Sequence, residues 1–189
     1  MQGLPPGAGA RLVRDVLDPS RVEALLAHLV GRGDWHHEQY RHIRARRATA
    51  WAAAPGVAYR YSGQTLTGAG MEPVLAEIVA EFEERFGTPT NSVLLNRYPD
   101  GRAAMGWHAD DEPELGPRPA VLSFSLGAAR DFQFKPKEGG SITTVRLEHN
   151  SLLLMEPGTQ ERCLHRLPPR PRVEEERYNL TLRRIRTPR

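Results

Sequence analysis

The C-terminal part of the chain contains the stretch Arg177-Tyr178-Asn179-Leu180-Thr181-Leu182-Arg183, in which polar and apolar side chains alternate. Successive side chains of a β-strand point to opposite faces, so this stretch predicts a strand with two different faces. Three alternate residues form an apolar face suited to a core, namely Tyr178, Leu180 and Leu182. The other four form a row of hydrogen-bonding side chains with an arginine at each end, namely Arg177, Asn179, Thr181 and Arg183.

Upstream of this strand, from residue 92 onward, short apolar segments alternate with turn sequences such as Pro99-Asp100-Gly101 and Glu138-Gly139-Gly140. The predicted strands are 92–98, 105–109, 120–126, 131–136, 142–148, 151–155, 161–167 and 177–185. Before them, residues 19–31 and 71–86 carry apolar side chains at helical spacing. Two helices before such a series of strands predict an α+β fold, with the helices packed on a β-sandwich or jelly roll.

The composition favours one globular domain over the whole chain, 1–189. Of the 189 residues, 39% are hydrophobic and 26% charged, which suits a compact core of this length. We find no window long enough for a membrane-spanning helix and no secretory signal at the N-terminus, where residues 1–9 are expected to be a short flexible leader. The single cysteine, Cys163, allows neither an intrachain disulfide nor a cysteine-based zinc site. These features favour a monomer in the reducing cytoplasm.

The net charge of +3 suits a polyanionic partner only modestly. Lys135 and Lys137 are the only lysines among the 26 basic residues, a bias typical of a GC-rich genome. Local clusters of basic residues are therefore better evidence for binding than the overall charge.

The segment His108-Ala109-Asp110 contains a first candidate for chemistry. On a strand, residues two apart point to the same face, so the imidazole and the carboxylate converge. Iron(II) oxygenases bind their metal with two histidines and one carboxylate. For the second histidine, His149 lies in a predicted turn and His165 in a predicted strand, which holds a ligand more rigidly, so we favour His165. An ordinary His–Asp hydrogen bond on a surface strand is the alternative.

The polar row of the C-terminal strand suits a small dicarboxylate, because arginine pairs with carboxylate in bidentate fashion. On a straight strand Arg177 and Arg183 are about 20 Å apart, so curvature and side-chain length must bring their tips closer. Solvated arginines on an exposed edge are the alternative. In the predicted strand 92–98, Asn96 and Tyr98 share one face and add a second polar pair.

Taken together, these segments resemble the AlkB family of dioxygenases. The matching segments are Asn96-Arg97-Tyr98 with Pro99-Asp100-Gly101, His108-Ala109-Asp110-Asp111-Glu112-Pro113, Ser123-Phe124-Ser125-Leu126-Gly127, Arg130-Asp131-Phe132-Gln133-Phe134, Ser151-Leu152-Leu153-Leu154-Met155, His165, and Arg177 to Arg183. Their order and spacing fit over about residues 57–186. One departure is Leu182, which stands where the family usually has phenylalanine; it lies on the core face, so it concerns packing.

The resemblance implies a double-stranded β-helix (jelly-roll) core over residues 91–186, Fe(II) as the metal and 2-oxoglutarate as the co-substrate. The implied metal ligands are His108, Asp110 and His165. The implied 2-oxoglutarate contacts are Asn96, Tyr98, Arg177, Asn179, Thr181 and Arg183. The implied reaction removes alkyl groups oxidatively from N-alkylated bases of DNA or RNA, and it releases succinate, CO2 and an aldehyde. Rival interpretations are the same chemistry on RNA, protein, lipid or a small molecule, and a non-catalytic nucleic-acid-binding jelly roll.

The nucleotide-recognition region that the resemblance implies is residues 34–63. A flipped base needs an aromatic sandwich, for which the family analogy offers Tyr59 with Tyr61 or Trp51. Asp111 and Glu112 are candidates for the base edge. For these residues core packing, or a solvated turn, is the competing interpretation.

A basic run accompanies these aromatic residues, namely Arg41, Arg44, Arg46 and Arg47, interleaved with Tyr40, His42 and Ile43. We interpret residues 34–50 as a phosphate-gripping loop in which Tyr40 or Ile43 fills the stack left by the flipped base. A solvated basic loop is the alternative.

Overall fold

The computed structural model describes residues 9–40, 43–61 and 64–186. The strands of this part are β1 (Ala10–Arg14), β2 (His36–Tyr40), β3 (Ile43–Ala53), β4 (Ala58–Tyr61), β5 (Gln64–Thr67), β6 (Ser92–Tyr98), β7 (Met105–His108), β8 (Val121–Gly127), β9 (Arg130–Pro136), β10 (Thr143–Leu147), β11 (Ser151–Met155), β12 (Cys163–Leu167) and β13 (Arg177–Arg183). The helices are α1 (Pro19–Gly31), α2 (Pro73–Phe86), the 3-10 turn η1 (Pro113–Leu115) and α3 (Thr159–Arg162).

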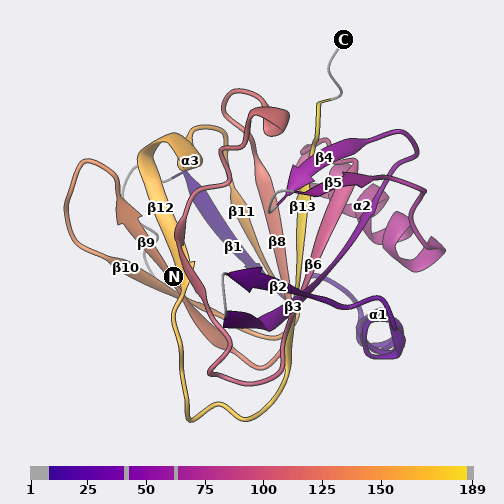
Figure 1. Cartoon of the computed structure of the whole chain (residues 1–189), viewed down its shortest axis with the longest axis horizontal. Helices are drawn as coiled ribbons and strands as arrows, with labels where there is room; N and C mark the ends of the chain where they lie inside the picture. Colours follow the sequence, from indigo (N-terminus) through magenta and orange to yellow (C-terminus); the bar gives the residue numbers. More distant parts are fainter. Residues whose placement is uncertain (1–8, 41–42, 62–63, 187–189) are drawn as a thin grey trace.

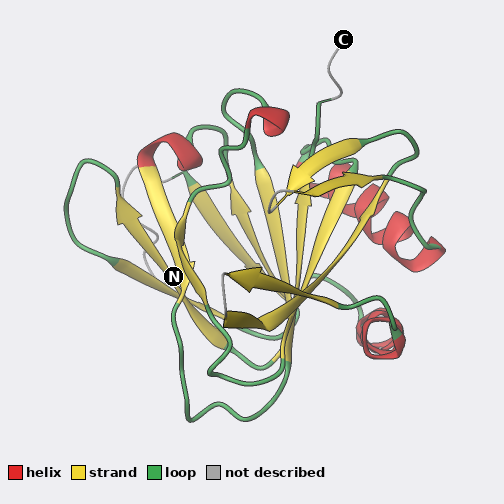
Figure 2. Cartoon of the chain, viewed as in Figure 1, coloured by secondary structure: helices red, strands yellow, loops and turns green. Residues whose placement is uncertain are grey.

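Two antiparallel sheets form the body of the described molecule (Figure 2). The larger one has the order β1-β11-β8-β13-β6-β3-β2 and the smaller one β10-β9-β12-β7, with β4 and β5 as a separate hairpin. Buried side chains from both sheets pack together, for example Leu153 and Met155 of the larger sheet with Phe134 and Cys163 of the smaller one. This arrangement confirms the predicted α+β fold with a double-stranded β-helix core.

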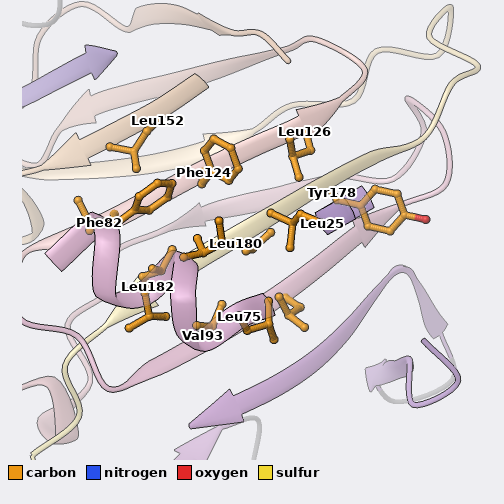
Figure 3. Close-up of a cluster of buried hydrophobic side chains, with 14 of the residues drawn as sticks. Leu25, Leu75, Phe82, Val93, Phe124, Leu126, Leu152, Tyr178, Leu180 and Leu182 are labelled. Atoms are coloured by element: carbon orange, nitrogen blue, oxygen red, sulfur yellow. The ribbon is translucent and has the colours of Figure 1, made fainter. Parts of the chain in front are cut away.

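Helices α1 and α2 cover the outer face of the larger sheet, as predicted (Figure 1). Figure 3 shows Leu25, Leu75 and Phe82 of the helices over side chains of the sheet. The partners in the sheet include Val93, Phe124, Leu180 and Leu182. The predicted bounds of α1 coincide with the observed ones, and α2 ends at Phe86, capped by Gly87, whose φ of 62° favours glycine. One face of β13 thus packs in the core beneath the helices, and its other face points to the interior between the sheets.

The prediction of a loop at residues 34–50 was wrong for residues 36–40 and 43–50, which form strands. Strands β2 and β3 form a hairpin at the edge of the larger sheet, and β3 pairs with β6. Strand β1 at the opposite edge was not predicted either. Four predicted strands are shorter than expected. Strand β7 ends at His108, β10 is limited to Thr143–Leu147, α3 occupies Thr159–Arg162 before β12, and β13 ends at Arg183.

No helix in the described ranges is long and apolar enough to cross a membrane.

Candidate metal and dicarboxylate site

Two strands of the smaller sheet bring together the three predicted metal ligands. His108 is the last residue of β7 and pairs with His165 of β12 in the sheet register, while Asp110 follows two residues beyond the strand end. The Nε2 atoms of the two histidines are 3.1 Å apart, and His165 Nε2 is 3.7 Å from Asp110 Oδ2. One ligand atom from each residue lies within 4.8 Å of the others, the only such group among the described residues. The triad therefore fits a divalent metal held on one face.

The protonation of His165 and the ring orientation of His108 suit metal binding. Burial lowers the pKa of His165 to about 4, so its ring is neutral at pH 7, which is the form that ligates metals. His108 Nδ1 lies 2.9 Å from the carbonyl oxygen of Gly106. Since a carbonyl only accepts, Nδ1 of His108 donates this hydrogen bond, and Nε2 is the ring atom that faces His165.

Asp110 is held as a carboxylate and positioned by two neighbours. Burial alone would raise its pKa, but the charge of Arg183, followed by the two histidines, outweighs this effect and lowers the pKa. Arg183 Nη1 donates to Asp110 Oδ1 at 3.2 Å. The Asp110 backbone N–H donates to Oε1 of Gln160 at 3.1 Å, and Gln160 is fully buried. Sequence reasoning missed Gln160; its only signal is a polar residue shortly before His165.

The polar row of β13 lines a cavity of about 90 Å³ that also contains the triad. This volume is several times that of one water-sized probe, so the cavity has room for a small ligand. The predicted 2-oxoglutarate contacts all lie on its wall, namely Asn96, Tyr98, Arg177, Asn179, Thr181 and Arg183. Arg47, Ser123 and Phe132 also line it, although the sequence analysis did not assign them to the co-substrate site. The predicted alternation of β13, with one polar face and one apolar face, is therefore observed.

Arg177 closes the cavity as a buried cation with incomplete partners. It is 2% exposed, and its Nη2 donates to Ser125 Oγ at 2.8 Å. Its Nε and Nη1 have no hydrogen-bond partner in residues 9–40, 43–61 and 64–186. Burial lowers the pKa of Arg177 to about 10. A buried guanidinium with two free donors fits a carboxylate, because such a ligand supplies both the charge and the acceptors.

The two arginines of the row have different environments. Arg183 contacts Asp110 of the metal triad, and its guanidinium carbon lies 5.1 Å from the centre of the Tyr59 ring. Arg177 instead contacts Ser125 on β8. Both arginines nevertheless line the same cavity, Arg183 in contact with the metal triad and Arg177 in contact with β8.

Arg47 lies inside the protein rather than in a phosphate-gripping loop. Its register in β3 turns it to the same side as Asn96 of β6. Arg47 donates to Asn96 Oδ1 and lies 3.0 Å from the Glu38 carboxylate, and both charged side chains are buried. Alternating arginine and alanine in this strand gave no apolar pattern from which the inward face could be predicted.

The predicted base-stacking residues are covered by other groups. Tyr59 is fully buried and stacks on Trp51 with ring centres 6.4 Å apart. The Tyr59 hydroxyl donates to Glu112 at 2.8 Å, and Glu112 also lines the cavity. Burial, with a smaller contribution from Glu112, raises the pKa of Tyr59, so the hydroxyl stays protonated. These contacts link the predicted substrate residues to the cavity through Glu112.

The remaining substrate candidates are at the surface or outside the described part. Asp111 is exposed and 3.3 Å from Lys137 Nζ, while Arg46 is exposed and 2.6 Å from Asp100. Tyr40 and Tyr61 end β2 and β4, but their side chains lie outside what the structure describes, as do Arg41 and His42. The structure therefore does not bring Asp111 and Arg46 to the cavity.

Comparisons with known proteins identify the family of this chain. The model of the 2OG-Fe(II) oxygenase superfamily matches residues 9–183. DNA oxidative demethylase ALKBH2 of Mus musculus is 39% identical over 161 residues, which cover 81% of this chain and 64% of that protein. Alpha-ketoglutarate-dependent dioxygenase alkB homolog 3 of Rattus norvegicus is 38% identical over 149 residues, which cover 74% of this chain and 50% of that protein. The chain therefore spans between half and two thirds of these relatives.

The solved structure of OsALKBH1 has the same fold. Its TM-score is 0.69 at 19% sequence identity, over 97% of this chain and 100% of that one. The family match extends from β1 to the end of β13, so it includes the triad and the polar row. Fe(II) and 2-oxoglutarate, which the family is named for, fit the three ligands and the buried Arg177. The chain therefore belongs to the 2OG-Fe(II) oxygenase superfamily and is AlkB-like within it.

Proposed function

We propose that this protein removes alkyl groups oxidatively from N-alkylated bases of nucleic acid, with DNA as the first substrate to test and RNA as the second. It uses Fe(II), O2 and 2-oxoglutarate, and it releases succinate, CO2 and an aldehyde. The observation that carries the proposal is one cavity lined by both the metal triad and the buried, incompletely partnered Arg177. The relatives named as DNA oxidative demethylase and alkB homolog 3 support the choice of substrate.

In this proposal His108, Asp110 and His165 hold the metal. Fe(II) held by these three residues would supply the redox chemistry that couples O2 to the oxidation of 2-oxoglutarate. Arg177 pairs with a carboxylate of 2-oxoglutarate and keeps it in one orientation. Arg183 keeps Asp110 ionised and oriented. The remaining polar residues of the wall donate to or accept from the co-substrate, namely Asn96, Tyr98, Asn179 and Thr181.

The substrate base enters beside Glu112. Trp51, Tyr59 and Tyr61 are the proposed aromatic surface for the base, and Asp111 and Glu112 the proposed partners of its edge. Since Tyr59 is fully buried, the base reaches its ring only after neighbouring side chains move. Tyr40 or Ile43 is proposed to fill the vacated stack, and Arg46 to bind phosphate. The region 34–63 thus serves a single catalytic domain, which we propose acts as a monomer in the cytoplasm.

The test uses anaerobic protein with Fe(II) and 2-oxoglutarate, to which O2 and methylated or unmethylated oligonucleotides of DNA and RNA are added. The proposal expects succinate and formaldehyde in equal amounts, and only with the methylated substrate. His108→Ala removes a ligand that is partly exposed, so the fold should persist while turnover falls to background. The amount of succinate could instead be the same with methylated and unmethylated oligonucleotides, with no formaldehyde from either nucleic acid. That result would contradict a demethylase of bases and favour protein, lipid or small-molecule substrates.

A further inference from the structure

A second cavity lies outside the site described above. It has a volume of about 450 Å³ and is bordered by β1, the chain after α2, the segment 115–120, the turn after β11 and the segment after β13. Its charged lining residues are Arg11, Arg118, Arg184, Arg186 and Glu156.

The charge of this cavity is unbalanced. Four arginines face one glutamate, and all five side chains are exposed. Arg118 lies 3.9 Å from the exposed Glu161 outside the cavity. For Arg11, Arg184 and Arg186 no ion pair is present within the described ranges. Neighbouring guanidinium groups repel one another, so the arrangement favours an anionic partner.

The backbone holds Arg186 in place at this cavity. Its backbone N–H donates to the carbonyl oxygen of Glu114 at 2.7 Å, which ties the segment after β13 to η1. Its guanidinium lies directly on Gly116, where an added Cβ would be 2.3 Å from Nε of Arg186. Gly116 also has a φ of 71°, a conformation that favours glycine. The side chain of Arg186 therefore occupies a space that other residues at position 116 would fill.

The cavity adjoins the proposed base-recognition residues. Arg183 points into the first cavity, and Arg184 lines the second one. Between Arg184 and Arg186, Ile185 is buried in a cluster that contains Tyr59 and Leu115. Leu115 lines the second cavity as well. The second cavity therefore adjoins the buried cluster around Tyr59, the residue beside which the base is proposed to enter.

We propose that this second cavity binds phosphates of the nucleic-acid backbone next to the base that enters the active site. The inference rests on the proposed function, since it assigns the polymer contacts of that same site. Arginine forms bidentate hydrogen bonds with phosphate. Several unpaired arginines along one open cavity suit consecutive phosphates of a polymer, because each contact releases condensed counterions.

The experiment compares wild type with the double variant Arg184→Gln/Arg186→Gln. Binding of a fluorescent single-stranded oligonucleotide is measured by anisotropy over a series of salt concentrations. The double variant should bind about tenfold more weakly near physiological salt, and the slope of log Kd against log salt should fall by about 1.4, from about 0.7 per lost phosphate contact. The thermal shift produced by Mn(II) with 2-oxoglutarate should equal that of wild type, which shows that the first cavity is intact.

The matched control is Lys135→Gln/Arg146→Gln, which removes two exposed charges from β9 and β10 of the smaller sheet. An equal loss of affinity in this control would mean that only net charge matters, and it would overturn the proposal. Displacement of the oligonucleotide by a mononucleotide at equal concentration would also overturn it, since the cavity would then take a small phosphate.

The two proposals fail in different ways. If wild type demethylates oligonucleotides and the double variant retains wild-type Kd and KM, the phosphate cavity is wrong and the proposed function stands. If the double variant loses affinity but wild type releases no formaldehyde from any methylated strand, the cavity stands and the proposed function is wrong.

Discussion

Arg46 and Arg47 are neighbours in β3, but they lie in opposite environments. Arg47 is 4% exposed and packs between Glu38 and Asn96, while the side chain of Arg46 is 54% exposed and reaches Asp100 at the surface. Burial makes an unpaired charge costly, so each inward arginine must have a partner or a ligand. Solvent screens the outward one. The partners of a buried charge in this protein therefore indicate its function. An exposed charge indicates function only through the molecules that it attracts.

The largest effect on stability is expected for Arg47→Ala. The substitution leaves the Glu38 carboxylate buried beside an empty space, and breaking one member of a buried pair costs about 3–5 kcal/mol. Urea unfolding of the variant should show that loss in the free energy of unfolding, and the apparent affinity for 2-oxoglutarate should fall as well because Asn96 loses its donor.

The control for this prediction is the double variant Glu38→Ala/Arg47→Ala, in which no charge remains at the pair. It should recover part of the loss. If the free energy of unfolding of Arg47→Ala were within about 1 kcal/mol of wild type, Arg47 would behave like a surface arginine. The two faces of β3 would then not differ in the way described.

Arg177→Met is expected to separate stability from binding. A drop in the pKa of Arg177 to about 10 corresponds to about 3 kcal/mol of cost for burying its charge, and the methionine variant avoids this cost. The variant also loses the hydrogen bond to Ser125, which is worth about 1 kcal/mol. The variant without ligand should therefore be more stable than wild type by about 2 kcal/mol. Its affinity for 2-oxoglutarate should fall about 100-fold, a loss typical of a buried charge pair.

The measurement is thermal unfolding with and without 2-oxoglutarate. Wild type should be stabilised by the ligand and the variant should not. If Arg177→Met retained the ligand-induced shift, the proposed carboxylate partner would be wrong. If the variant were strongly destabilised, Arg177 would be a structural residue of the core.

A smaller effect is expected at Gln160, which acts on the metal only through the backbone of Asp110. Gln160→Ala should weaken metal binding about 10-fold to 100-fold, as is usual for residues that orient a ligand. Mn(II) titration followed by electron paramagnetic resonance measures the affinity directly, and Gln160→Glu tests whether an acceptor of the same shape restores it. Unchanged affinity in Gln160→Ala would show that Asp110 is positioned by Arg183 alone.

The same contrast explains what could be predicted from the sequence. The strict alternation of Arg177 to Arg183 predicted both faces of β13, and the apolar stripe of 19–31 predicted α1 with its bounds. Residues 43–53 carry arginine and alanine on both faces, so neither the strand nor the inward orientation of the Arg47 side chain could be predicted from the sequence. Gln160 was missed for another reason. Its contact with Asp110 spans 50 positions and depends on tertiary packing.

The smallest effect is expected for Arg46→Ala. The Asp100 carboxylate also accepts the backbone N–H groups of Arg102 and Ala103, so the turn keeps its local bonds and the free energy of unfolding should change by less than about 1 kcal/mol. If Arg46 binds phosphate, affinity for every oligonucleotide should fall by the same few-fold factor, and the salt slope should fall by about 0.7.

Arg46→Lys should restore most of that slope, because a phosphate contact needs charge more than shape. A loss of affinity that depended on the methylated base would contradict a contact with phosphate alone. It would mean that an outward arginine reads the base, and that the hairpin of β2 and β3 folds over the cavity when nucleic acid binds. A loss that is equal for all sequences keeps Arg46 on the outer face, where charge attracts the strand and the buried residues select the base.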